Sequence, residues 1–150
     1  MKYIVTLFVA VAVMAVGTLN AQTASKLNGQ SFTYMMKNAD GTGEEIIDQI
    51  TFGAGTVISK ELGKSGFASG SVAERNAGTT SDFDLTFTKP GGDKYVYTGI
   101  AQGVEFHGTI VVTDANGAQS NMLFRGLLTE EWNNILKEKE AARKARESKQ

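Results

Sequence analysis

The sequence predicts an all-β fold, an eight-stranded antiparallel up-and-down (meander) barrel followed by a C-terminal α-helix. Three observations predict it: apolar residues that alternate with polar ones, turn signals at short regular intervals, and a last segment without glycine or proline. Alternation with a period of two is typical of strands with one packed face. A final segment rich in Lys, Arg, Glu and Ala is typical of a helix.

Seven turn signals divide the segment 22–128 into eight stretches. They are Asn38–Gly41, Gly53–Gly55, Gly63–Gly66, Asn76–Gly78, Pro90–Asp93, Ala101–Gly103 and Asp114–Gly117. Glycine and asparagine tolerate the positive φ angles that tight hairpin turns need. Short consecutive connections favour a barrel, whereas the alternative, a two-sheet sandwich, usually needs long Greek-key connections.

The alternation also predicts which side chains share a strand face. The apolar sets are Phe32, Tyr34 and Met36; Phe83, Leu85 and Phe87; Val104, Phe106, Gly108, Ile110 and Val112; and Met122, Phe124, Gly126 and Leu128. Glycines inside strands, at positions 70, 99, 108 and 126, indicate tight bends or close strand packing.

The predicted helix starts at Thr129, which we expect to cap it, with Glu130 and Glu131 at the positive end of its dipole. Trp132, Ile135 and Leu136 lie on one face of this helix. We expect Trp132 to dock the first turns on the barrel and the remainder to be solvated, with Glu140 and Lys144 forming an i, i+4 pair. A partner-binding helix is the alternative.

The first 21 residues are typical of a secretory signal peptide: a basic start, an apolar run over Ile4–Val16 and cleavage after Ala21. The alternative, a transmembrane anchor, needs about 20 apolar residues, and this run is shorter. No cysteine follows that would carry a lipid anchor. We therefore expect a mature periplasmic or secreted chain, without stable membrane insertion, made of a barrel domain (22–128) and a helix (129–150).

A signal peptide, eight strands in meander order and a helix after the last strand resemble the calycin group of small barrels, which includes the lipocalins. The resemblance is one of layout and covers Leu27 to about Leu136. It implies that the helix packs against the outside of the barrel, where Trp132 and Leu136 would fill the contact.

Composition excludes several kinds of chemistry. The chain has no cysteine and one histidine, which leaves no disulfide, no thiolate nucleophile and no multi-histidine metal centre. Segment 22–128 has eleven acidic and eight basic residues, which argues against nucleic-acid binding. We predict no cofactor and no metal.

One pair of side chains has the chemistry for proton transfer. Glu105 and His107 project from the same side of one strand, with Thr109, and a carboxylate beside an imidazole can move protons inside a cavity. A metal site would need further ligands such as Asp82, Asp84 or Glu74. We favour the simpler interpretation, that these residues lie on the solvated face of a strand.

Three function classes follow. The first, which we prefer, is a non-enzymatic exported barrel that binds a small apolar ligand in its interior. The candidate ligand-binding residues are Phe32, Tyr34, Phe52, Phe83, Phe87, Phe106 and Phe124. The second is an envelope or extracellular protein-interaction module that uses the C-terminal helix or a barrel edge. The third, an enzyme built on Glu105 and His107, is not expected.

Overall fold

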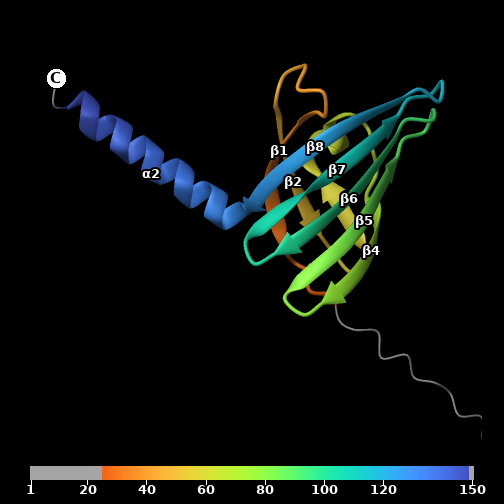
Figure 1. Cartoon of the computed structure of the whole chain (residues 1–150), viewed down its shortest axis with the longest axis horizontal. Helices are drawn as coiled ribbons and strands as arrows, with labels where there is room; N and C mark the ends of the chain where they lie inside the picture. Colours follow the sequence, from red (N-terminus) through yellow and green to blue (C-terminus); the bar gives the residue numbers. More distant parts are fainter. Residues whose placement is uncertain (1–24, 149–150) are drawn as a thin grey trace, which may run out of the picture.

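The computed structural model describes residues 25–148. The predicted signal peptide, residues 1–21, lies outside the described residues. Eight strands form one closed antiparallel barrel in meander order, as predicted (Figure 1). They are β1 (Ser31–Asn38), β2 (Ile46–Phe52), β3 (Thr56–Ser59), β4 (Gly70–Ala77), β5 (Thr80–Thr88), β6 (Lys94–Gln102), β7 (Glu105–Thr113) and β8 (Gln119–Leu128). The barrel closes because β1 pairs with β8, with Tyr34 opposite Gly126.

Every predicted turn lies at a connection between two strands, although Asn76–Gly78 and Ala101–Gly103 begin within β4 and β6. One connection contains more than a turn. The connection between β3 and β4 includes a short helix, α1 (Lys60–Lys64), before the turn at Ser65 and Gly66. The Ser59 hydroxyl caps this helix by accepting a hydrogen bond from the Leu62 N–H. The sequence analysis missed α1 because five residues are too short to show a helical period.

The packed face predicted from the alternation is the inner face on the four strands where the alternation was identified, β1, β5, β7 and β8. On β5, Ser81, Phe83, Leu85 and Phe87 are buried, and the intervening residues are not. The same phase holds on β7, where Phe106 and Ile110 are fully buried. The inward-facing side chains therefore form one contiguous hydrophobic core inside the barrel.

The glycines within strands make room for aromatic rings, which refines the prediction of tight packing. A Cβ at Gly99 would lie 2.7 Å from the ring carbons of both Phe83 and Phe124. At Gly126 it would lie 2.4 Å from the Cβ of Tyr34, on the neighbouring strand. These two positions accept no side chain, because backbone and ring atoms already occupy the space.

Connecting segments contribute to the core at both ends of the barrel. At the end where β2 finishes, Leu27 is buried, and the Gly29 N–H donates to the Phe52 carbonyl. At the opposite end, Leu62 of α1 and the following Phe67 join the core, and Phe67 meets the Tyr95 ring edge-on at 5.3 Å. The interior is thus covered by apolar side chains at each end.

The second helix, α2 (Thr129–Glu147), extends away from the barrel (Figure 1). None of its residues is buried, and Leu136 is 51% exposed. Trp132 docks the first turns on the barrel, as predicted, but Leu136 does not fill the contact that the calycin layout implies. No residue separates β8 from α2, so the chain has no loop in which to reverse direction. Neither helix within residues 25–148 is both long and apolar enough to span a bilayer.

Candidate functional site

All seven predicted ligand-binding residues lie inside the barrel. Phe32, Tyr34, Phe52, Phe83, Phe87, Phe106 and Phe124 are each at most 3% exposed. Phe106 is at the centre of the cluster: its ring centroid is 4.7 Å from that of Phe32 and 4.9 Å from those of Phe83 and Phe124. Because aromatic pairs are in contact at about 4.5–7 Å, these rings pack against one another.

A buried polar cluster, missed by the sequence analysis, lies among these rings. Asp48 on β2 is 2% exposed, and its Oδ2 accepts hydrogen bonds from the Tyr34 hydroxyl at 2.7 Å and the Ser59 hydroxyl at 2.6 Å. Its Oδ1 accepts from the backbone N–H groups of Gln49 and Glu61. The carboxylate therefore ties the start of α1 to the barrel interior.

Two tyrosines continue this cluster into the core. The Tyr34 and Tyr97 hydroxyl oxygens are 3.1 Å apart. Burial raises the pKa of Tyr34 well above its ordinary value, with smaller contributions from the neighbouring Tyr97 and Asp48. Burial is also the main cause of the raised pKa of Tyr97. Both phenols are therefore neutral hydrogen-bonding groups at neutral pH.

The signal for Asp48 was present in the sequence. Asp48 is in phase with Ile50 and Phe52, which face the core, so period-two alternation directs its side chain inward. Its partners could not be inferred, because Tyr34 and Ser59 lie on two other strands and Glu61 lies on α1.

Glu105 and His107 lie on the outer face of β7, as the alternation predicts. Glu105 is exposed and His107 is partly buried, and His107 is paired in register with Arg125 of β8. Within residues 25–148, no group of three or more His, Cys, Asp or Glu side chains is arranged to hold a metal ion. Two of the other candidate ligands have protein partners: Asp84 pairs with Arg75 at 2.8 Å, and Glu74 accepts a hydrogen bond from the Lys26 N–H.

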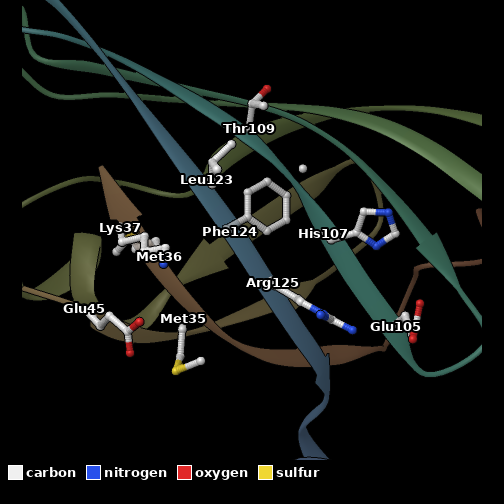
Figure 2. Close-up of a pocket in the computed structure, with 11 residues that line it drawn as sticks. Met35, Met36, Lys37, Glu45, Glu105, His107, Thr109, Leu123, Phe124 and Arg125 are labelled. Atoms are coloured by element: carbon white, nitrogen blue, oxygen red, sulfur yellow. The ribbon is translucent and has the colours of Figure 1, made fainter. Parts of the chain in front are cut away.

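Both residues belong to a groove on the outer wall formed by β1, β7 and β8, with a volume of about 630 Å³ (Figure 2). Its lining residues are Met35, Met36, Lys37, Glu45, Glu105, His107, Gly108, Thr109, Leu123, Phe124 and Arg125. Met35 and Leu123 are 38% and 44% exposed, which is high for large apolar side chains. We call this surface the outer groove; it combines apolar residues with charged residues of both signs.

The base of α2 rests on the barrel through a small contact. Leu128, not Thr129, occupies the N-cap position, and no side chain caps the helix. The prediction of a Thr129 cap is wrong, because its hydroxyl instead lies 3.0 Å from that of Thr33 on β1. Trp132 is partly buried and lines a cleft of about 230 Å³ with Thr33 and Ile47.

Beyond its base, α2 carries one continuous face without an acidic residue, which we call the α2 stripe. At helical spacing it consists of Trp132, Ile135, Leu136, Lys139, Ala142, Arg143 and Arg146. The stripe begins apolar and becomes basic. The predicted pair forms beside it: the Lys144 ammonium is 2.8 Å from the Glu140 carboxylate.

These features define the class of the protein: a small closed antiparallel barrel with a filled aromatic interior, an outer groove and a projecting C-terminal helix. Its layout is compatible with a lipocalin-like barrel. Comparison of the chain with protein-family profiles, curated proteins and solved structures gives no match.

Proposed function

We propose that this protein is an exported, non-enzymatic interaction module of the cell envelope or extracellular space, with α2 as its partner-binding element. Export is proposed on the predicted signal peptide at residues 1–21, which directs the mature chain to the periplasm or out of the cell. Kinship with the calycins is proposed on layout alone. The barrel is the rigid support, and α2 is the element that reaches a partner.

One observation carries the proposal: α2 is a 19-residue helix with no buried residue. Most helices in proteins gain their stability by packing an apolar face on the rest of the fold. In α2 strong helix formers and the ion pairs Glu140–Lys144 and Arg143–Glu147 support the helix instead. An arm about 28 Å long that adds little to the core is better suited to contact with another molecule.

The alternative function is binding of a small apolar ligand inside the barrel by the seven interior aromatic residues. Their inward orientation supports it. It requires the rings around Phe106 to separate, because they are in mutual contact. Apolar material that co-purifies with the protein and is released in native mass spectrometry would favour this alternative.

Site-specific photo-crosslinking in producing cells tests the proposed role of α2. A photoreactive amino acid at Leu136, on the α2 stripe, is expected to give an adduct larger than the monomer. The same amino acid at Ala141, on the opposite side of the helix, is the matched control and is expected to give none.

Truncation after Lys137 completes the test. It removes the basic part of the stripe and should abolish the adduct from Leu136, while the melting temperature changes by no more than about 2 °C, because residues 138–148 are all exposed. Equal adducts at both positions, or none at either, would contradict the proposal.

A further inference from the structure

We propose that the partner of α2 is a second copy of this chain, and that the α2 stripe of each copy lies in the outer groove of the other. This inference rests on the proposed function, because it names the partner of the same helix. The product is a symmetric dimer formed by exchange of helices. Four features of the chain lead to it.

First, α2 cannot reach the outer groove of its own barrel. Leu128 ends β8 in an extended conformation, with φ −46° and ψ 135°, and Thr129 already begins the helix. A helix that returned to its own wall would need a loop, and connections of this kind usually take about 2–6 residues. A direct junction sends the helix outward, and elements with short hinges are those that copies of a protein most readily exchange.

Second, the far part of the α2 stripe and the outer groove both expose apolar side chains, and these do not meet within one copy. On α2, Leu136 is 51% exposed. On the barrel, Met35 and Leu123 of the outer groove are exposed, and Ile47 beside the base of α2 is 54% exposed. Burying these side chains against each other removes apolar surface from water, and this stabilises the contact by about 25 cal/mol per Å² of buried surface. Only a second copy brings the far part of the stripe to such a wall.

Third, the charges of the two surfaces are complementary where the stripe becomes basic. Lys139 and Arg143 of the stripe can face Glu45 and Glu105, the carboxylates of the outer groove. The groove also has Lys37 and Arg125. Acidic residues that flank the stripe, Glu140 and Glu147, offer carboxylates to these cations.

Fourth, the same charges disfavour the simpler pairing of two α2 helices along their stripes. In a parallel arrangement such a pair would bring the lysine and arginines of one helix (Lys139, Arg143 and Arg146) against their counterparts, and like charges in contact destabilise an interface. Helix on groove avoids this repulsion. An isologous pair also makes the contact twice, which helps it reach the roughly 1,200–2,000 Å² of a stable interface.

The test is a charge exchange between two variants of the mature chain, residues 22–150, followed by light scattering after gel filtration. The helix variant is Lys139→Glu/Arg143→Glu, and the groove variant is Glu45→Lys/Glu105→Lys. Each variant alone places like charges in both contacts, so we expect its dimer dissociation constant to rise at least about tenfold. An equimolar mixture restores opposite charges in both contacts and should form a heterodimer.

The control is Lys137→Glu, which reverses a charge on the other side of α2, outside the ion pairs Glu140–Lys144 and Arg143–Glu147, and should leave the dimer intact. Circular dichroism of all variants verifies that α2 remains helical. A wild-type chain that is monomeric at all concentrations overturns the inference, as does a dimer that both variants leave unchanged. If the Leu136 crosslink then joins a different protein, the proposed function stands and only the second copy is excluded.

Discussion

The strands of the barrel and the helix α2 are stabilised in opposite ways. In the barrel the strands are held by packing, with aromatic rings such as Phe106 fully buried and glycines such as Gly99 giving them room. In α2 no residue is buried, and local helix propensity with i, i+4 ion pairs supports the helix. Stability therefore belongs to the barrel, and the exposed helix is free to take part in recognition. Three measurements examine this division.

The largest effect is expected from Phe106→Ala. This ring contacts five others at the centre of the core, and its removal should lower the free energy of unfolding by about 3–5 kcal/mol. Leu136→Ala on α2 is the comparison and should change it by no more than about 0.5 kcal/mol. Denaturant unfolding of both variants measures the difference. Similar losses would show that α2 shares in the stability of the fold.

A smaller loss is expected from Gly99→Ala. The new Cβ would lie 2.6 Å from the His107 carbonyl oxygen and 2.7 Å from two phenyl rings, so strands and rings must shift. We expect a loss of about 1–3 kcal/mol, typical of overpacking. Gly63→Ala, where no atom lies within 4 Å of the new Cβ, is the control and should be neutral or slightly stabilising. A Gly99→Ala variant as stable as wild type would mean that the interior is looser than the ring contacts indicate.

The third effect is a gradual loss of folding stability as the pH becomes alkaline. Tyr97 has a raised pKa in the folded barrel, and it ionises near its ordinary value of 10.0 once unfolded. Its contribution to stability is therefore complete below pH 10.0 and is lost as the pH rises toward the folded pKa.

Tyr97→Phe should accordingly lessen the fall in unfolding free energy above this pH by about 1.4 kcal/mol per pH unit. Tyr95, which is only half-buried and whose pKa is raised mainly by burial, should give a smaller change when replaced by Phe. Urea unfolding at several pH values measures both slopes. Equal slopes in wild type and Tyr97→Phe would place the alkaline sensitivity elsewhere.

Much of the fold followed from local patterns. Phe83, Leu85 and Phe87 were assigned to the inner face because alternation is set by the pleat of a single strand. The turns were predicted from glycine and asparagine, whose backbone preferences are also local. The helix α1 was missed, since it is five residues long and its cap depends on Ser59 at the end of a strand.

The site was less predictable. Asp48 alternates in step with the buried residues Ile50 and Phe52 of the same strand, so the period-two pattern by itself would have placed its side chain inside the barrel. Its hydrogen bonds to Tyr34 and Ser59 connect β2 to its two neighbouring strands, β1 and β3, and depend on a strand register that alternation alone does not give. The outer groove was not predicted either, because Met35, Leu123 and His107 become neighbours through the pairing of β1, β8 and β7.

By itself the sequence determined the eight-stranded meander, the packed apolar faces of β1, β5, β7 and β8, the turns and the existence of the last helix, because these depend on neighbours along the chain. Only the tertiary structure decided that the aromatic rings fill the barrel, that Asp48 is held by two hydroxyls and two amides, and that Leu136 stays exposed rather than filling the contact that the calycin layout implies. The ring packing depends on the closure of β1 on β8, the Asp48 hydrogen bonds depend on the pairing of β2 with β1 and β3, and the position of α2 depends on a junction without a loop.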